Sequence, residues 1–239
     1  MKDKFDYYDI TAVCTPGMVA IMAGYYVVLG DITTLLNKLL QISLGSSVIL
    51  CVSCYCVGEV IQTIGKLLEK FFWYTHGGLP TVWIAEDIKP KRLKFMRSEA
   101  PIILPSYKEN ALAERLSKGK KLKSSDIDSN FHSIKIKCYE NEIARKELTR
   151  ILAKTNAMRG YVIIILGLLI NNIIQDINLT ENKNILAYIA YIVLLIFCLY
   201  RYRYLSIKYA QTLYAGYCDQ LAKEFIPTST PRRAMGVNN

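Results

Sequence analysis

The chain has 239 residues, of which 52% are hydrophobic and 21% charged, and its formal net charge at pH 7 is +10. The hydrophobic fraction is only slightly above that of an ordinary globular domain, so its distribution along the chain is more informative than its size. Asp3, Asp6 and Asp9 precede the first apolar segment, and no small-residue cleavage site follows a short apolar core. These features argue against a secretory signal peptide, and we expect the first segment to be retained as a span.

Two pairs of apolar segments bracket a basic, polar middle. The first pair covers about residues 10–30 and 40–61, and the second covers about residues 160–175 and 185–200. A helix needs about 20 mostly apolar residues to cross a hydrocarbon core about 30 Å thick. Any one segment alone is also compatible with a buried helix of a soluble protein. Four of them in two closely spaced pairs predict an all-α membrane protein with four transmembrane helices in two hairpins.

The predicted organisation has four parts, and the part between the hairpins is expected to be a mainly helical cytoplasmic domain. Glycines and a proline in residues 76–80 predict a turn after the second span. Apolar periodicity predicts further helices over residues 140–159 and 207–225. The parts are an N-terminal segment with hairpin 1 (1–61), a basic cytoplasmic domain (62–158), hairpin 2 (159–200), and a cytoplasmic helix with a disordered tail (201–239).

The placement of basic residues predicts the orientation. Of the 30 lysines and arginines, 20 lie between Lys66 and Arg159, whereas the two short hairpin connections contain only Lys38 and Lys183. Loops rich in lysine and arginine stay on the cytoplasmic side. We therefore expect a multi-pass protein of the inner membrane with both termini in the cytoplasm. The alternating arginines and tyrosines of residues 200–204 are typical of an interfacial anchor, and stacking on single-stranded nucleic acid is the alternative.

Polar residues inside the spans are candidates for a pore or gate. Glu59 lies near the end of the second span, and Gln62 is predicted to share its helix face. An intramembrane carboxylate usually faces a bundle interior or a water-filled path, and acidic rings favour cations. Ser47 and Asn171 are further candidates for this path. Alternatively, Glu59 extends into cytoplasmic water at the interface, and Asn171 caps the outer end of its span.

The basic middle predicts an anionic partner. Residues 66–159 contain 20 basic and 11 acidic side chains, a net charge of +9. Basic segments beside a membrane are often held by anionic lipid headgroups, and a nucleotide or oligonucleotide is the alternative ligand. The candidate contacts for an anionic ligand are Lys89, Lys91, Arg92, Lys94, Lys120 and Lys121.

Catalytic and metal-binding signatures are sparse. The sequence has no H-E-x-x-H, G-x-S-x-G or P-loop pattern, so we assign no catalytic residue, metal or cofactor. His76 beside two glycines is best explained as a turn residue. Cys51, Cys54 and Cys56 lie in an apolar span without a nearby histidine, which favours structural thiols over metal ligands. A protein that is not an enzyme is therefore expected.

Several segments resemble small four-span membrane effectors of bacterial anti-phage defence systems, with the Hailong effectors as the nearest named group. The similarity lies in residues 5–10, 16–19, 58–69, 77–81 and 156–161, and extends loosely over nearly the whole chain. The resemblance implies a homo-oligomeric ion channel, paired with a nucleotidyltransferase whose nucleic-acid-like product controls gating. It carries over no ligand-binding residues.

Two other functions are compatible with the sequence. A membrane scaffold could recruit a soluble partner protein through the predicted helices 140–159 and 207–225. A lipid-modifying enzyme could use His76, although no nucleophile stands in a recognisable motif near it.

Overall fold

The structure is a computed structural model that describes residues 7–29, 37, 44–75, 78–83, 112, 114–117, 123–178 and 185–225. Every element in this part of the chain is helical. In chain order the elements are the π-helix η1 (Asp9–Cys14), α1 (Thr15–Leu29), α3 (Leu44–Thr75), the 3₁₀-helix η2 (Pro80–Val82), α5 (Ser124–Tyr139), α6 (Glu142–Asn178) and α7 (Ile185–Phe225).

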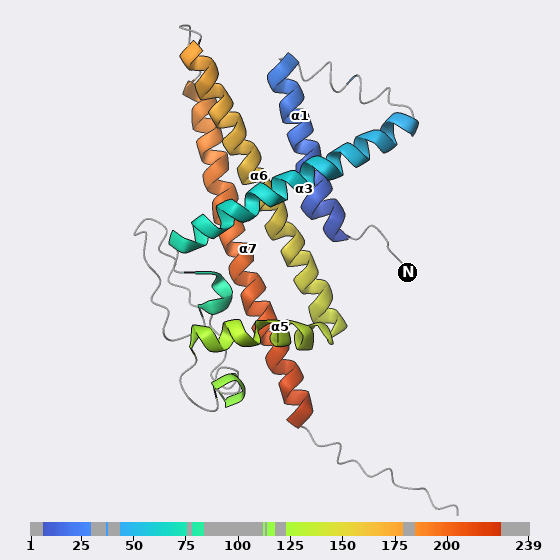
Figure 1. Ribbon diagram of the computed structural model, residues 1–239, viewed down its shortest axis with the longest axis vertical. Helices are drawn as coiled ribbons and strands as arrows, with labels where there is room; N and C mark the ends of the chain where they lie inside the picture. Colours follow the sequence, from blue (N-terminus) through green and yellow to red (C-terminus); the bar gives the residue numbers. More distant parts are fainter. Residues whose placement is uncertain are drawn as a thin grey trace, which may run out of the picture.

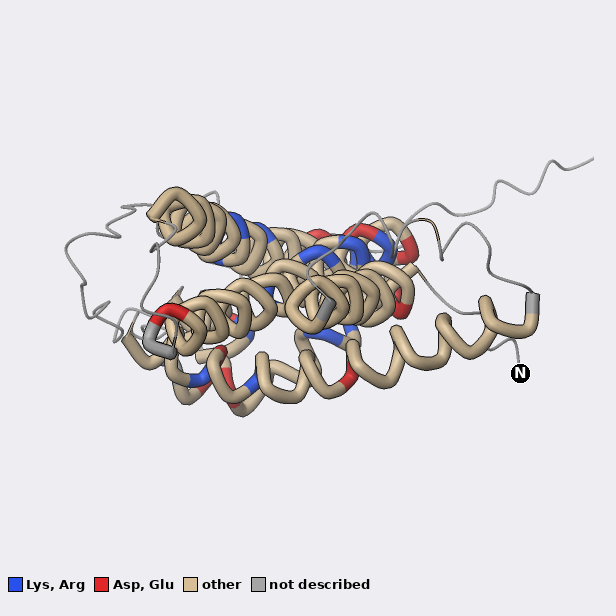
Figure 2. Tube along the Cα trace, turned by 90° about the horizontal axis from the view of Figure 1, so that it is seen from above, with Lys and Arg blue, Asp and Glu red and all other residues tan. Residues whose placement is uncertain are grey.

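Four helical stretches of the described chain are long and apolar enough to cross a membrane. They are η1 with α1, α3, α6 and α7. No charged residue occurs in α1, in residues 160–175 of α6 or in residues 185–200 of α7. Figure 2 shows from above that long stretches of the helical tubes carry no charged residue. The prediction of an all-α membrane protein with four candidate spans is thereby confirmed at this level. The arrangement indicates a multi-pass membrane protein.

The helices α6 and α7 form a long antiparallel pair that runs the length of the molecule (Figure 1). We call residues 160–178 and 185–200 its upper half, and residues 142–159 and 201–225 its lower half. In the view of Figure 1, α1 lies beside the upper half, α3 crosses the pair obliquely, and α5 lies across its lower half. The helices predicted over 140–159 and 207–225 are continuous with the adjoining spans. In α7, no glycine or proline interrupts residues 185–215.

The start of α1 is shaped by a proline. Pro16 has no N–H to donate to the carbonyl of Ala12 four residues earlier, and the chain here forms the π-helix η1. Close backbone contact with α3 follows directly. A Cβ on Gly17 would lie 1.8 Å from the carbonyl oxygen of Cys54, and one on Gly58 would lie 2.2 Å from that of Val13. Only glycine at these two positions permits this crossing.

The lower half contains a conventional hydrophobic core. It is formed by α5, the lower halves of α6 and α7, and Leu112. The short helix η2 packs against this core and contacts α5 and α7. Asn141 caps the N-terminus of α6, because its Oδ1 accepts hydrogen bonds from the backbone N–H groups of Ile143 (3.0 Å) and Ala144 (3.4 Å). The α5 helix was not predicted from the sequence.

The predicted domain boundaries stay predictions. The predicted disordered tail beyond residue 225, most of the middle between residues 84 and 122, and His76 lie outside the described residues. The helix that includes the second predicted span extends to Thr75, so it continues well past residue 61 and ends at the predicted turn.

Candidate functional site: a buried polar cluster where four helices meet

A buried arginine lies where the apolar part of α6 begins. The Arg159 side chain is 10% exposed and precedes Gly160, the first residue of the upper half. Its Nη1 forms an ion pair with Glu69 of α3, and its Nη2 donates a 2.7 Å hydrogen bond to Oε1 of Gln62 on the same helix. A buried charge without a partner is strongly destabilising. These contacts therefore explain how an arginine is accommodated here.

Glu69 connects α3 to α7 as well as to α6. The hydroxyl of Tyr202 donates a 2.9 Å hydrogen bond to Glu69 Oε1, and the indole Nε1 of Trp73 donates a 3.0 Å bond to the Tyr202 oxygen. Both aromatic side chains are buried. Each oxygen of the Glu69 carboxylate thus accepts from a donor on a different helix, which makes these bonds charge-assisted.

Gln62 connects α3 to η1 and to the backbone of α6. Its Nε2 donates to the carbonyl oxygens of Ala12 (2.6 Å) and Asn156 (3.0 Å). In a regular α-helix the Ala12 carbonyl would accept a hydrogen bond from the N–H of residue 16, but this residue is a proline and has no N–H. The Asn156 side-chain amide donates in turn to the hydroxyl of Tyr8 (2.5 Å). One amide side chain therefore satisfies groups from two other helices.

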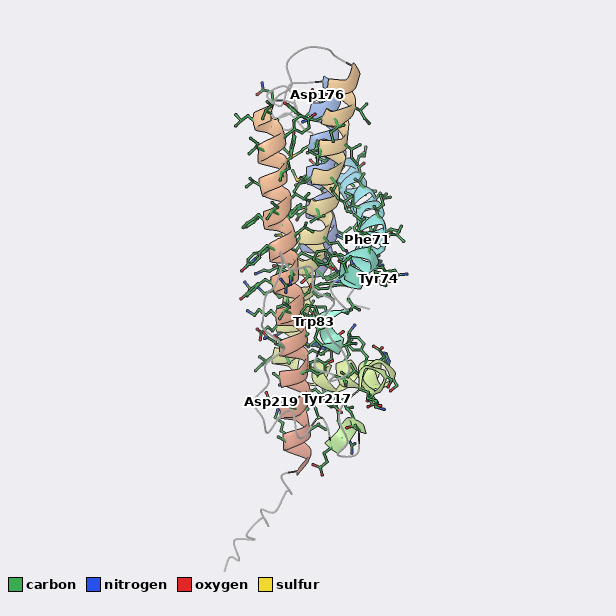
Figure 3. All side chains as sticks on the ribbon, turned by 90° about the vertical axis from the view of Figure 1, so that its left-hand side faces the viewer. Phe71, Tyr74, Trp83, Asp176, Tyr217 and Asp219 are labelled. Carbon is green, nitrogen blue, oxygen red and sulfur yellow. The ribbon has the colours of Figure 1, made fainter. Side chains whose placement is uncertain are left out.

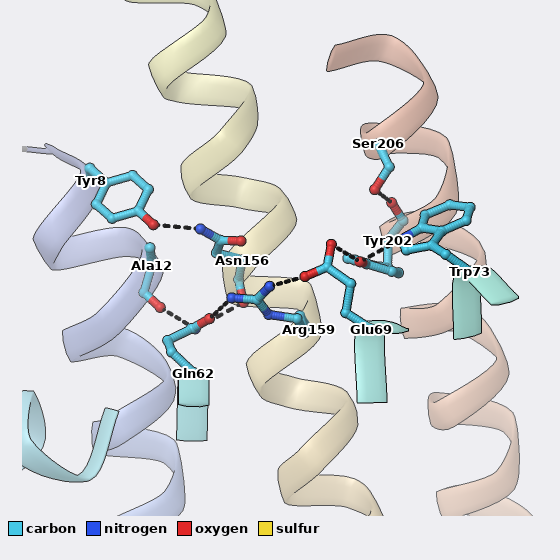
Figure 4. Close-up of polar contacts among 9 residues, drawn as sticks. All are labelled: Tyr8, Ala12, Gln62, Glu69, Trp73, Asn156, Arg159, Tyr202 and Ser206. Atoms are coloured by element: carbon cyan, nitrogen blue, oxygen red, sulfur yellow. Dashed lines mark hydrogen bonds and ion pairs between the residues drawn. The ribbon is translucent and has the colours of Figure 1, made fainter. Parts of the chain in front are cut away.

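We call this set of side chains the Arg159 cluster (Figure 4). It holds η1, α3, α6 and α7 together at the level where the upper and lower halves meet. The Nε of Arg159 is buried and finds no hydrogen-bond partner among the described residues. Because sliding of α3 against α6 or α7 would break charge-assisted bonds, the cluster fixes the register of these helices. Its members are Tyr8, Gln62, Glu69, Trp73, Asn156, Arg159 and Tyr202.

An aromatic contact joins the cluster to residues 78–83, which precede the predicted anion contacts. The rings of Trp73 and Trp83 meet edge to face, with centroids 5.8 Å apart. The Trp83 indole donates a 3.0 Å hydrogen bond to the carbonyl of Gly78, a residue with a φ of 105° that suits glycine. Residues 78–83 are therefore held against α3 beside the cluster. By contrast, Phe71 and Tyr74 project outward from the same helix (Figure 3).

The four predicted pore residues lie in different environments. Gln62 belongs to the Arg159 cluster, whereas Glu59 is exposed on α3. The two side chains therefore do not share one environment, although they were predicted to share a helix face. A separation of three residues turns one side chain about 60° away from the other around the helix axis. Ser47 lines an apolar groove of about 750 Å³ between α3 and the η1–α1 segment. Asn171 is half-buried in the upper half of α6. The assignment of these four residues to one pore stays a prediction.

The predicted anion contacts belong to the basic middle of the chain. Lys89, Lys91, Arg92, Lys94, Lys120 and Lys121 all lie outside the described residues.

The cysteines are all described, and none of the seven forms a disulfide. Cys51 and Cys56 are exposed on α3, and Cys54 is buried against Gly17 of α1. In the described part of the chain, no three His, Cys, Asp or Glu side chains gather as metal ligands would.

Sequence reasoning missed the Arg159 cluster, although a signal for it exists. Ile151, Thr155 and Val162 are buried and recur at helical spacing on one face of α6. Arg159 falls on that same face, so the pattern places a charge among core positions and requires a buried partner. The sequence spacing does not identify Glu69, which lies 90 residues away.

Comparison of the chain with protein-family models, with curated proteins and with solved structures finds no match in any of the three.

Proposed function

We propose that this protein is a homo-oligomeric membrane effector that forms a gated, cation-preferring path. The observation that carries the proposal is an exposed polar stripe on α3, one of the candidate spans. Glu59, Thr63, Lys66 and Lys70 recur at spacings of four, three and four residues, so they share one face of the helix, and all four are exposed. Gln62 and Glu69, which belong to the cluster, lie about a quarter turn around the helix from this stripe.

A carboxylate that faces lipid is energetically expensive. Charged residues in membrane helices almost always face a bundle interior or a water-filled cavity. Within one copy of the chain, the interior side of α3 is already occupied by the Arg159 cluster. Closed rings of identical subunits bring the same face of each copy around an axis. In such a ring Glu59 would face a shared path, where a ring of carboxylates favours cations.

The position of the cluster suggests how gating would reach this path. The α6 and α7 helices run without a break from the upper half into the lower half. The Trp73–Trp83 contact adds a second connection, because residue 83 lies six positions before Lys89, the first of the predicted anion contacts. We infer that a ligand bound by the basic middle would pull on residues 78–83 and shift α3 against the cluster. In this proposal the ligand is bound by the predicted anion contacts between Lys89 and Lys121.

The membrane arrangement follows from charge. We infer that α1 with α3 and α6 with α7 form two transmembrane hairpins, and that the lower half of the α6–α7 pair lies in the cytoplasm with both termini. The support is the excess of lysine and arginine below the spans. This would make the lower half, together with α5, the cytoplasmic domain of an inner-membrane protein.

The biological setting is inferred from the resemblance alone. Similarity to four-span anti-phage effectors supports a role in bacterial defence, control by a nucleotide or oligonucleotide, and a nucleotidyltransferase as the partner enzyme.

Ion flux through purified protein in liposomes tests the proposal. We expect cation flux that responds to short oligonucleotides, and a Glu59→Gln variant with a lower cation-over-anion permeability ratio. Glu59→Lys should lower that ratio further, because it reverses the charge that attracts cations. The matched control is Glu140→Gln, which removes an exposed carboxylate between α5 and α6, below the spans. It should leave the permeability ratio unchanged.

Two outcomes would contradict the proposal. If folded, oligomeric protein gives no flux with or without oligonucleotide, the membrane scaffold becomes the better explanation. If the Glu59→Gln and Glu140→Gln variants have the same cation-over-anion permeability ratio, Glu59 lies at the membrane interface and not along the path.

A further inference from the structure

A basic groove runs along the seam between the lower halves of α6 and α7. Its volume is about 580 Å³, and both helices contribute cations to its walls. Lys146, Arg150 and Lys154 come from α6, whereas Arg201 and Lys208 come from α7. The groove is distinct from the Arg159 cluster, and none of its residues belongs to the predicted anion contacts.

The charges in the groove are poorly compensated. Glu147 is the one carboxylate in its lining, and Lys146 is paired with Glu142 at 2.7 Å. Within the described part of the chain, no ion pair neutralises Arg150, Lys154 or Lys208. Like charges held around one concave surface repel each other, so a bound anion would stabilise this arrangement.

The groove opens at the level where the apolar segment of α7 ends. Arg201 directly follows the uncharged residues 185–200. Lys154 lies five residues before Arg159, which corresponds to about 8 Å along the helix. The headgroup layer on each side of a bilayer is about 5–8 Å thick. The upper end of the groove therefore falls at headgroup depth if the uncharged segments span the membrane.

An apolar stripe leads from the membrane into the groove. Val193 and Phe197 are exposed on α7 at spacings of eight and four residues before Arg201, so they share its helix face. Tyr204 continues this face one turn further, and the guanidinium of Arg201 lies over its ring at 5.2 Å. The groove floor includes the buried side chains of Ile151 and Leu205. An amphiphile with an acyl chain along Phe197 would thus place its polar head beside Arg201.

We propose that this groove binds the phosphate of an anionic phospholipid. Arg201 and Lys154 hold the phosphate at headgroup depth, while Arg150 and Lys208 hold further negative charge of the headgroup. Guanidinium and ammonium groups are suited to phosphate oxygens, and the adjoining apolar stripe is unsuited to a free nucleotide or inorganic phosphate. The proposal rests on the membrane position of α6 and α7 but not on ion conduction. The bound lipid would link the two long helices at the boundary between their halves.

Lipid titration of the full-length chain in detergent, read by native mass spectrometry, tests the assignment. Phosphatidylglycerol should bind, and phosphatidylcholine, whose headgroup has no net charge, should bind at least tenfold more weakly. A Lys154→Gln/Arg201→Gln variant should bind phosphatidylglycerol about 30-fold more weakly, as expected for two basic residues near a membrane surface. The matched control, Arg145→Gln/Lys223→Gln, removes the same two residue types from exposed positions of the same helices. It should bind the lipid as the unmodified chain does.

Three outcomes would overturn the proposal. The first is an equal loss of affinity for phosphatidylglycerol in both double variants, which would mean that the lipid responds to the net charge of the protein and not to the groove. The second is equal binding of the two lipids. The third is competition by inorganic phosphate or a short oligonucleotide at the concentration that saturates with phosphatidylglycerol, which would assign the groove to a soluble anion. Circular dichroism of both variants establishes that they are folded.

Discussion

The two halves of α7 follow opposite rules of burial. In the upper half, large apolar side chains such as Leu194 and Phe197 are exposed. In the lower half, Leu213, Tyr214 and Leu221 are almost fully buried against α5 and α6. A single unbroken helix thus changes its pattern near Arg201. The two halves are therefore suited to different surroundings, since the upper half exposes its apolar side chains and the lower half buries them in a core.

The Arg159 cluster lies at the boundary between these surroundings. In the upper half most of the large exposed side chains of α6 and α7 are apolar, whereas the polar side chains of the Arg159 cluster bind one another at the boundary. Variants at this boundary, and in the two halves of α7 on either side of it, show how sharply the surroundings change.

Removing the positive charge of the cluster should destabilise the protein most. Arg159→Met leaves the Glu69 carboxylate with hydroxyl contacts but without a cation. Breaking a buried pair in this way costs about 3–5 kcal/mol, and we expect the lower end because the Glu69 side chain is 27% exposed. The free energy of unfolding is measured by circular dichroism during titration with a denaturing detergent.

A double variant separates the charge effect from lost packing. Arg159→Met/Glu69→Gln removes both charges and keeps a hydrogen-bonding side chain for Tyr202. It should recover a large part of the loss seen with Arg159→Met alone. If the single variant costs under about 1 kcal/mol, the pair is solvated and the cluster does not lie at a boundary with hydrocarbon.

A matched pair of leucines compares the two halves directly. Leu213→Ala deletes a fully buried side chain and should cost about 3 kcal/mol, within the range for buried leucines. Leu194→Ala makes the same chemical change in the same helix, but Leu194 is 48% exposed on the upper half. It should cost well under 1 kcal/mol in the unfolding titration. Equal losses would mean that Leu194 is covered, for example by a second copy of the chain.

The sequence predicted the fold better than the site because the two depend on different distances along the chain. Apolar runs are local, so the candidate spans could be found without knowing their neighbours. The Arg159–Glu69 pair joins residues 90 positions apart, and only the crossing of α3 over α6 brings them together. The neighbouring crossing of α3 with the η1–α1 segment depends on Gly17 and Gly58, whose small size predicts close approach but not the partner helix.

The missed helix α5 had a local signal that its composition obscured. Ile127, Ile134 and Cys138 are fully buried and share one helix face. The segment also begins with Lys123, whose backbone N–H donates to Asp126, three residues later. The lysine-rich stretch before it drew the prediction toward a loop. Charge composition describes the exposed face of a helix, whereas periodicity identifies the buried one.

The smallest expected effect is a pH dependence of the lower core. Burial, with a smaller contribution from the negative charge of Asp219, raises the pKa of the Cys138 thiol from 9.0 to about 11. An unfolded thiol therefore releases its proton above pH 9.0, while the folded one keeps it up to about pH 11. The stability that this group contributes is complete below pH 9.0 and is lost as the pH rises through this window.

Cys138→Ala should make the fall in unfolding free energy between pH 9 and 11 shallower, whereas Cys56→Ala, at an exposed position, should leave the slope unchanged. Identical slopes for the Cys138 variant and the unmodified chain would show that water reaches the thiol. Water would then enter the core of the lower half, and the two halves would differ less in how well they exclude water from their side chains.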